Sequence, residues 1–305
     1  MNQAATVVVS TYAADRFEVL RDCIQSLRDQ TTPPAEIIVV VDRNPPLLRR
    51  VRRDFEGVVT VENDAFPGAG GARNTGLRRV TTPFVAFIDD DAEASHCWLE
   101  NHLGAYADPL TIGTGGGLEP AWETGRPAWF PPEFDWVVGC TFEGMPAPGG
   151  IMRNPISANM TARTDALRAV GGFRPNFGKI GMLSLPEDTD LGIRVLGAFP
   201  GHHWRYRPAA TARHRVPPER ATMAYFFRRC WYEGTGKAQL VGHVGPQGLA
   251  SEWEYSRRAL PLAFARALRD GAVNRDVDAL RRAGAVVLGF VATASGYIVG
   301  RVRGT

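Results

Sequence analysis

The chain has 305 residues, of which 44% are hydrophobic and 22% are charged. This length suffices for one large α/β domain with a helical extension, and the composition is that of a globular protein. The formal net charge of +3 is a small excess spread along the chain, which argues against a nucleic-acid-binding protein. The four cysteines show neither a Cys-x-x-Cys pair nor zinc-type spacing, and the first residues do not resemble a signal peptide. We therefore expect a cytoplasmic protein.

Short β-branched runs alternate with helical stretches over the first ninety residues. Strands are predicted at 5–10, 36–42, 58–61 and 84–88, and helices at 15–30, 46–55 and 71–79. This alternation predicts a parallel sheet that is covered by helices on both faces. In such sheets ligands bind at the carboxyl ends of the strands, so functional residues are expected just after each strand.

A polar cluster follows each of the four predicted strands. The clusters are Ser10-Thr11-Tyr12, Asp42-Arg43-Asn44, Asn63-Asp64 and Asp89-Asp90-Asp91. We expect all four clusters to line one edge of the sheet.

The rest of the chain is less regular until its last third. Residues 113–150 are rich in Gly, Pro and Trp, which predicts irregular loops around a pocket. A helix is predicted at 187–199 and strands around 204–207 and 210–216, followed by helices at 220–239, 252–269 and 276–299. We place a boundary near Val216, between a domain of residues 1–216 and a helical extension of residues 217–305.

The last predicted helix contains an apolar stretch, residues 283–299, with arginines on both sides. At about 1.5 Å per residue the stretch is about 25 Å long, which is short for a bilayer core, and glycines interrupt it. A membrane-spanning helix is therefore not expected. We favour a helix that packs in a core or forms a dimer, and the alternative is a basic-flanked helix at a membrane surface.

The acidic triplet Asp89-Asp90-Asp91 follows the apolar run PFVAFI. Three adjacent carboxylates repel one another unless a cation is present, and Mg²⁺ and Mn²⁺ favour carboxylate, phosphate and water oxygens. The alternative is a solvated acidic turn that begins the next helix. Because the triplet ends a predicted buried strand, we favour a divalent metal that bridges carboxylate and diphosphate.

A glycine-rich turn, PGAGGARN at 67–74, leads into a predicted helix. Its backbone N–H groups and Arg73 are suited to a phosphate. It is not the dinucleotide fingerprint G-x-G-x-x-G, because Arg73 stands at the third glycine and the turn follows the third strand.

Two further positions have both a structural and a chemical interpretation. Glu187, Asp188 and Asp190 open a predicted helix, where they either cap it or supply a general base for an attacking hydroxyl. His214 lies in the strand-like run TARHRV and is either a ligand of a metal or phosphate or a half-buried structural histidine.

Taken in order, these segments resemble the family 2 glycosyltransferases of GT-A fold over about residues 5–235. The motifs are VVVSTY at 7–12, IIVVVD at 37–42, GGARNTGL at 70–77, FIDDDAE at 87–93, NPISANM at 154–160, GGF at 171–173 and EDTDLGIR at 187–194. The resemblance implies an α/β fold in which a Rossmann-like nucleotide-binding sheet is flanked by helices. Residues 1–216 would then bind a nucleotide-sugar and perform catalysis, and residues 217–305 would form the helical C-terminal extension.

The resemblance also implies roles for the residues of the donor site. Thr11, Tyr12 and Asp42 correspond to contacts with the nucleotide, and Arg73 to a residue near its base or diphosphate. Two departures from the family pattern concern the same region, because Ser10 replaces a usual proline and Asp42-Arg43-Asn44 replaces Asp-Asp-Gly-Ser.

For the metal and the reaction, the resemblance implies a second set of residues. Asp89 and Asp91 match the D-x-D pair of the family, with Asp91 as the direct metal ligand, and Asp89 and Asp90 are expected to contact the nucleotide-sugar. His214 approaches the metal and phosphates. Asp188 is the catalytic base and Glu187 its neighbour.

The implied activity is the inverting transfer of a single hexose-like sugar from a UDP-, GDP- or dTDP-sugar to a hydroxyl, with Mn²⁺ or Mg²⁺ as cofactor. The acceptor is a sugar, a lipid or a small molecule, and aromatic residues of the loop region would bind it: Trp122, Trp129, Phe130 and Trp136. The helical extension would contact the inner face of the cell membrane peripherally or form a dimer.

Two other functions remain as alternatives. A nucleotidyltransferase that makes nucleotide-sugars would have a glycine-rich basic loop after its first strand, where this chain has Ser10-Thr11-Tyr12. A non-catalytic nucleotide-sugar binding protein would not need Asp188.

Overall fold

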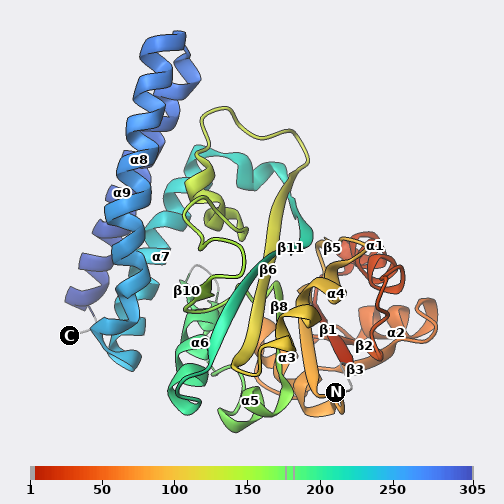
Figure 1. Cartoon of the computed structure of the whole chain (residues 1–305). Coiled ribbons are helices and arrows are strands. Elements are labelled where there is room, and N and C mark those ends of the chain that lie inside the picture. Colours follow the sequence, from red (N-terminus) through yellow and green to blue (C-terminus); the bar gives the residue numbers. More distant parts are fainter. Residues whose placement is uncertain (1–3, 176, 181–182, 304–305) are drawn as a thin grey trace. The chain divides into compact units, whose positions relative to one another are not determined.

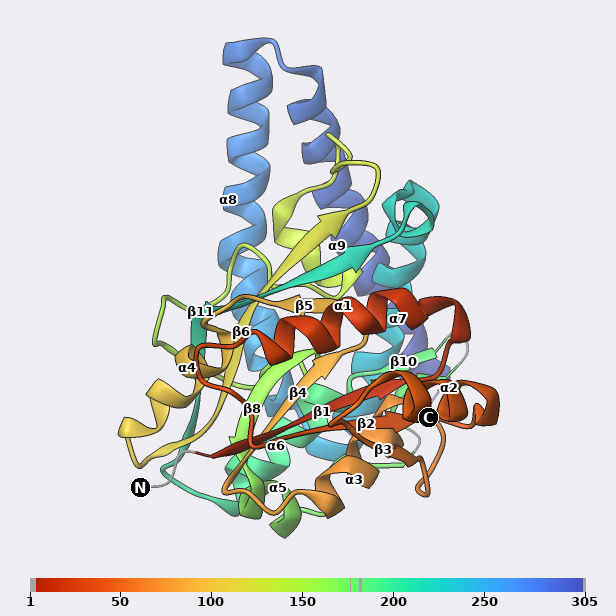
Figure 2. The same cartoon turned by 90° about the vertical axis from the view of Figure 1, so that its right-hand side faces the viewer.

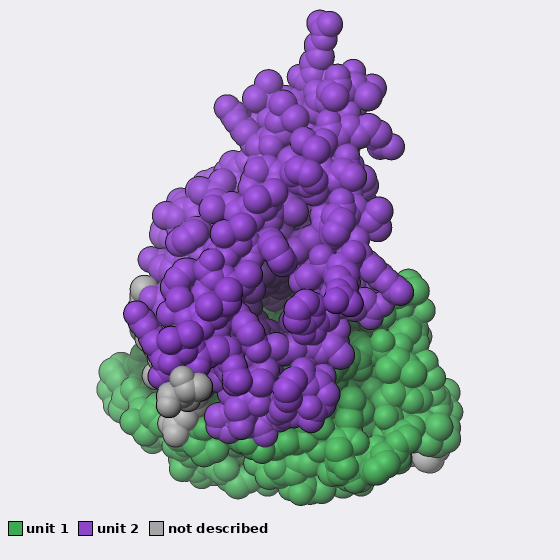
Figure 3. Space-filling view, turned by 90° about the vertical axis from the view of Figure 1, so that its left-hand side faces the viewer, with its two compact units in different colours: residues 1–119, 146–179, 187–214 green, residues 120–145, 180–186, 215–305 purple. Residues whose placement is uncertain are grey.

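The computed structural model describes residues 4–175, 177–180 and 183–303 and is drawn in Figure 1. The chain forms two compact units. Unit 1 comprises residues 1–119, 146–179 and 187–214, and unit 2 comprises residues 120–145, 180–186 and 215–305. The two units are coloured separately in Figure 3. They interleave along the sequence, and the simple boundary at Val216 stays a prediction.

The first strands form the parallel part of the sheet in unit 1. They are β1 (Ala5–Thr11), β2 (Glu36–Val41), β3 (Val59–Glu62) and β4 (Phe84–Asp89). β1 pairs in parallel with β2 and β4, and β2 pairs with β3. Their valines and isoleucines suit a sheet that is buried on both faces. In this register Ser10 lies opposite Asp89, so these two polar clusters share one edge, as predicted.

Helices connect these strands in the predicted order: α1 (Phe17–Arg28), which follows the short 3₁₀ helix η1 (Ala14–Arg16), α2 (Pro45–Asp54) and α3 (Ala69–Arg79). α1 buries Leu20, Ile24 and Leu27, which recur at helical spacing on one face. α2 begins at a proline, and the side chain of Asn44 accepts a hydrogen bond from its backbone. α1 and α3 lie on opposite sides of the sheet (Figure 2).

The sheet continues with antiparallel strands, so it is mixed and not wholly parallel as predicted. The added strands are β5 (Ala92–Ala94), β6 (Thr111–Trp122), β7 (Ile151–Met152), β8 (Asn159–Arg163) and β11 (His203–Val216). The order is β3-β2-β1-β4-β8-β6-β11-β5, with β7 on β11. The two strands predicted around 204–207 and 210–216 are one continuous strand, β11.

The loop prediction for residues 113–150 is wrong at its start, where β6 extends to Trp122. A Cβ atom at Gly113 would lie 2.1 Å from the ring of Trp204, and one at Gly116 would lie 2.2 Å from the carbonyl oxygen of Ala210. The glycines of β6 are therefore required by close packing against neighbouring strands, although their composition is typical of loops.

Shorter elements complete the structure. They are α4 (Trp98–Leu103), α5 (Thr164–Ala169), α6 (Glu187–Ala198), the two-stranded sheet of β9 (Gly178–Ile180) and β10 (Leu183–Leu185), and the 3₁₀ helices η2 (Gly104–Ala107), η3 (Pro132–Val138), η4 (Pro218–Ala221) and η5 (Pro246–Leu249). α6 confirms the helix predicted at 187–199.

The helical part of unit 2 confirms the three helices predicted after residue 216. They are α7 (Met223–Val244), α8 (Ala250–Asn274) and α9 (Val277–Arg303), and α9 packs against both others. Contact between α7 and α9 depends on glycine, because a Cβ at Gly296 would lie 2.2 Å from the carbonyl oxygen of Trp231. Among the described helices, α9 alone is long and apolar enough to cross a membrane by length and composition.

The packing of α3 on β1 generates a prediction about stability. A Cβ at Gly76 would lie 2.4 Å from Cγ1 of Val8, which is fully buried and cannot move aside. We expect Gly76→Ala to destabilise the protein by about 1–3 kcal/mol through overpacking. Gly197→Ala in α6 is the matched control, because nothing lies within 4 Å of its added methyl group. Thermal unfolding followed by circular dichroism should show a lower Tm for the first variant and an unchanged or higher Tm for the second.

Candidate active site

Two aspartates of the triplet and one histidine form a group that could hold a metal ion. Asp89 ends β4, Asp91 lies between β4 and β5, and His214 comes from β11. One potential ligand atom from each of the three lies within 4.8 Å of the others. The antiparallel pairing of His214 with Ala92 brings the histidine to the triplet. Two carboxylates and an imidazole form a suitable ligand set for Mn²⁺ and an acceptable one for Mg²⁺.

The middle aspartate, Asp90, lies outside this group and is hydrogen-bonded to other side chains of the protein. Its carboxylate accepts hydrogen bonds from Thr11 Oγ1 at 2.6 Å and from Arg16 Nη1 at 3.1 Å. Burial, with the nearby charge of Asp91, raises the pKa of Asp90 to about 6. Thr11 and Asp90 thus join the ends of β1 and β4, and their contact with a nucleotide stays a prediction.

Arg16 is a residue of the site that the sequence reading missed. Its Nη1 lies 3.1 Å from oxygens of both Asp90 and Asp91, and its guanidinium lies over the ring of Tyr12 at 5.6 Å. The available signal was its position in the short segment after the first strand. Arg16 therefore adds a half-buried positive charge beside the carboxylates.

Arg73 is buried and connects two parts of the site. It donates from Nη2 to Asp89 at 2.7 Å and from Nη1 to Glu187 at 2.6 Å. Burial alone would lower the pKa of Arg73, but the charges of Asp89, Glu187 and Asp188 raise it overall. The sequence predicted a residue near a base or diphosphate, and the contacts seen here are with two carboxylates.

The donor-site prediction also included Asp42 and Tyr12. Asp42 accepts hydrogen bonds from Asn63 Nδ2 at 2.6 Å and from the backbone N–H of Gly68 at 2.8 Å, so it braces the start of the glycine-rich turn. The first turn of α3 needs glycine at Gly71, where a Cβ would lie 1.7 Å from the carbonyl oxygen of Phe66. Tyr12 is 59% exposed at the same edge of the sheet.

The two acidic residues at the start of α6 differ in their partners. Burial raises the pKa of Glu187 to about 7 and also raises that of Asp188, although the charge of Arg73 opposes both shifts. Asp188 accepts hydrogen bonds from the side chain and backbone of Ser157. Its Oδ1 has no hydrogen-bond partner among the described residues. A buried carboxylate with one free oxygen and a raised pKa is suited to accept a proton, and among the described residues this applies to Glu187, through its Oε2, as well as to Asp188.

Asp190, the third acidic residue of this motif, has a structural role. It is fully buried and lies 2.7 Å from Arg194 Nε and 3.5 Å from Arg174 Nε. Its charge is therefore compensated by two arginines of unit 1. In this respect Asp190 differs from Asp188.

The aromatic residues predicted to bind an acceptor pack on one another in unit 2. The Phe130 ring is buried, with its centroid 5.0 Å from that of Trp122, 5.3 Å from that of Trp129 and 5.3 Å from that of Phe226. Trp136 is adjacent to Phe134 at 5.6 Å. Phe130 is thus part of the core, whereas Trp122, Trp129 and Trp136 are half-buried, and their role in acceptor binding stays a prediction.

Comparison with known proteins gives consistent results. The sequence model of the family described as glycosyl transferase family 2 matches residues 6–171, more than half of the chain. Glucosyl-dolichyl phosphate glucuronosyltransferase of Haloferax volcanii is 28% identical over 300 residues, which cover 97% of this chain and 95% of the relative. Pre-mycofactocin glycosyltransferase of Mycobacterium tuberculosis is 28% identical over 265 residues, which cover 75% of this chain and 54% of the relative.

A solved structure is similar over nearly the whole chain. It is a mannosyltransferase from Pyrobaculum calidifontis in complex with GDP-Man and Mn²⁺, with a TM-score of 0.57 and 17% identity over 96% of this chain and 86% of that one. This likeness confirms the GT-A fold with C-terminal helices. With the family matched over most of the sheet that carries the site, the chain belongs to glycosyl transferase family 2.

Proposed function

We propose that this glycosyltransferase transfers a sugar, with inversion, from a nucleoside-diphosphate sugar to an acceptor hydroxyl, and that it depends on a divalent cation. The observation that carries the proposal is the convergence of Asp89, Asp91 and His214 at the edge of the sheet where β1 and β4 end. The Pyrobaculum mannosyltransferase, with its GDP-Man and Mn²⁺, supports this class of donor and cofactor.

Asp89, Asp91 and His214 would hold the cation, because their oxygen and nitrogen atoms fit Mn²⁺ or Mg²⁺. A cation bound there supplies positive charge that stabilises a departing diphosphate. Arg16, beside Asp90 and Asp91, adds a second positive charge at this edge. Tyr12, exposed on the same edge, is available to contact the nucleotide.

Asp188 would act as the general base. Ser157 holds the carboxylate in place, and the unpartnered Oδ1 is the atom that would take the proton from the acceptor hydroxyl. An inverting transfer needs one such base on the face of the sugar opposite the leaving group. Burial raises the pKa of Asp188, which makes its carboxylate a stronger proton acceptor than that of an exposed aspartate.

Arg73 and Glu187 would position the cation group relative to the general base, Asp188. The guanidinium holds Asp89 of the cation group with one nitrogen and Glu187, next to the base, with another. Because Arg73 is buried, this spacing is set by the packed interior of unit 1 and not by a flexible surface contact.

We further propose that the acceptor is a sugar carried on a polyprenyl phosphate lipid. The Haloferax relative, whose name includes a dolichyl phosphate, aligns over 97% of this chain and thus includes the C-terminal helices. Among the acceptors predicted from the sequence, the lipid class is the one this alignment supports.

The cation group is tested by Asp91→Ala. We expect the variant to lose the enhancement by Mn²⁺ of nucleoside-diphosphate binding, measured by titration calorimetry with UDP and GDP. Glu93→Gln is the control, because Glu93 is an exposed carboxylate two residues away and outside the group. An unchanged Mn²⁺-linked affinity in the Asp91 variant would contradict the proposed cation site.

The base is tested by Asp188→Asn. We expect transfer to fall by about a hundredfold or more, the lower range for loss of a general base, while nucleoside-diphosphate affinity stays the same. Asp190→Asn should instead lower the Tm, because it weakens a buried ion pair with Arg194. Turnover at the wild-type rate in the Asp188 variant would remove the base assignment and favour a non-catalytic binding protein.

The acceptor class is tested with short-chain polyprenyl phosphate sugars and the corresponding free sugars. With each UDP- and GDP-sugar and Mn²⁺, we expect transfer to the lipid-linked sugar to exceed transfer to the free sugar by about tenfold or more in kcat/KM, the factor that about 1.4 kcal/mol of lipid binding provides. Equal rates on both would show that the lipid contributes nothing to recognition.

A further inference from the structure

The outward face of α9 is apolar, which is unusual for a helix at a protein surface. Five of its exposed large residues are Leu280, Val287, Val291, Ile298 and Val302, which are between 48% and 71% exposed, and Val277 and Phe290 are exposed as well. The first five are spaced by seven and four residues, so they form one stripe along the helix. We call these five residues the α9 stripe. At about 1.5 Å per residue the α9 stripe is about 33 Å long.

The opposite face of α9 is buried and made mostly of small residues. They are Ala279, Ala283, Ala285, Val286, Gly289, Ala292 and Gly296. Packing within unit 2 therefore explains the small apolar residues on the buried face of α9. It does not explain the large apolar residues of the α9 stripe. A continuous exposed apolar surface of this kind marks an interaction site in proteins.

Basic residues without acidic partners lie at the end of the α9 stripe. Arg301 and Arg303 are exposed, and neither has a carboxylate at ion-pair distance among the described residues. The remaining arginines of α9 differ, because Arg281 pairs with Asp278 and Arg282 with Asp276. The free positive charge is thus concentrated at the C-terminal end of the helix.

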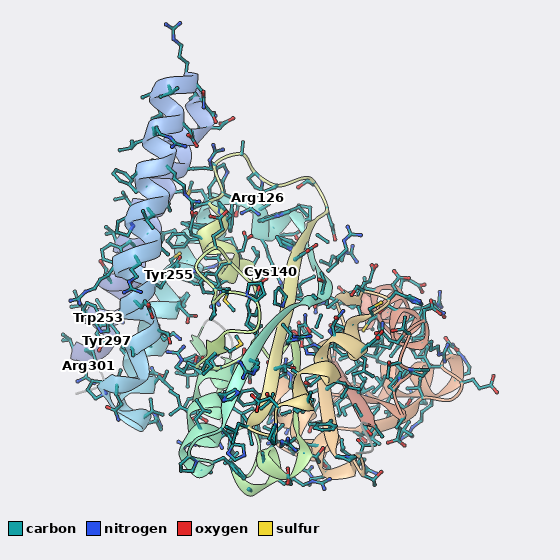
Figure 4. All side chains as sticks on the ribbon, in the orientation of Figure 1. Arg126, Cys140, Trp253, Tyr255, Tyr297 and Arg301 are labelled. Atoms are coloured by element: carbon teal, nitrogen blue, oxygen red, sulfur yellow. The ribbon has the colours of Figure 1, made fainter. Side chains whose placement is uncertain are left out.

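An aromatic residue and a further arginine lie at the same end of the hairpin that α8 and α9 form. Trp253 is 61% exposed, and the guanidinium of Arg257 lies over its ring at 5.4 Å. α8 and α9 run antiparallel, so Trp253 lies level with Tyr297 and Arg301, as Figure 4 shows. Exposed tryptophan with basic residues is typical of the interface between a bilayer and water.

We propose that the α9 stripe and the arginines at its end bind the surface of a membrane that contains anionic lipids. The apolar side chains would enter the boundary between headgroups and acyl chains, and Arg301 and Arg303 would contact the phosphates. The charge complementarity favours this occupant over a second copy of the chain, because the acidic residue of α9, Asp278, is already paired with Arg281 and so offers Arg301 and Arg303 no free carboxylate.

The neighbours of α9 favour a helix that lies on the membrane over one that crosses it. In α7 the half-buried Glu233 lies 3.4 Å from the buried Lys237, and Lys237 also lies 2.7 Å from Glu252 of α8. Such charged groups are costly in hydrocarbon. Only the outward face of α9 can therefore enter the bilayer while its other face stays packed on α7.

The proposal is tested by cosedimentation of the full chain with vesicles. We expect binding to phosphatidylglycerol–phosphatidylcholine vesicles to exceed binding to phosphatidylcholine alone by about tenfold. Val291→Asp/Ile298→Asp should lower binding to both kinds of vesicle by about tenfold or more. Arg301→Glu/Arg303→Glu should remove the preference for the anionic vesicles. Equal binding of all variants would overturn the proposal.

Two controls change the same chemistry on unit 1. Leu110→Asp replaces another exposed apolar residue, and Arg49→Glu/Arg52→Glu reverses two exposed arginines of α2. Both should bind vesicles like the wild type. If the double aspartate variant does not fold by circular dichroism, Val291→Ser/Ile298→Ser tests the same face with a smaller change.

Two further results would overturn the proposal in favour of another occupant. A wild-type dimer in light scattering that Val291→Asp/Ile298→Asp converts to a monomer would identify a second copy of the chain. A chain that leaves membranes only in detergent would identify a spanning helix. The inference extends the proposed lipid-linked acceptor, but the assay needs no turnover. If the wild type does not bind vesicles but shows Mn²⁺-linked affinity for UDP or GDP, only this proposal is removed. If it binds vesicles but shows no Mn²⁺-linked affinity for either nucleotide, only the proposed function is removed.

Discussion

The site depends on the burial of one guanidinium between two carboxylates. Arg73 is nearly inaccessible, and its two ion pairs connect Asp89 at the end of β4 with Glu187 at the start of α6. A buried charge is tolerated only when it is compensated, so each partner constrains the position of the others. The distance between the acidic triplet and α6 is thus part of the folded interior of unit 1.

Close backbone packing makes this arrangement possible. Gly76 lets α3, which carries Arg73, lie directly against Val8 of β1. Gly71, in the first turn of α3, lets the helix approach the backbone of Phe66 closely. In the same unit, Gly113 and Gly116 let β6 approach the side chains and backbone of neighbouring strands. Any larger residue at these positions would displace an element that supports the site.

Unit 2 uses small residues in a related way, with a different result. Glycine and alanine on the inner face of α9 allow close contact with α7, and this leaves the large apolar residues on the outer face. A helix with this distribution is stable on one side by packing and available on the other for a second apolar environment. Unit 1 carries the proposed sugar-transfer site, and unit 2 carries the surface that we propose binds a membrane.

Local patterns in the sequence determined the strands and helices of the first ninety residues, the helix α6 and the three C-terminal helices. They also predicted that polar residues follow the strands. Because β1 and β4 run parallel, Ser10 and Asp89 lie at the same edge of the sheet. The family followed from ordered motifs, each of which carries little weight alone.

Only the tertiary structure decided which of these residues meet. His214 reaches Asp91 because β11 pairs with β5 across more than a hundred positions of sequence, a contact that no local pattern encodes. The ion pairs of Arg73 with Glu187 and of Arg16 with Asp90 and Asp91 likewise join residues that lie far apart in the sequence. The glycines of β6 were misread because their reason lies in Trp204 and Ala210, residues far along the chain. The exposed side of α9 was undecided for the same reason: hydrophobicity is a property of the sequence, but burial depends on what packs against it.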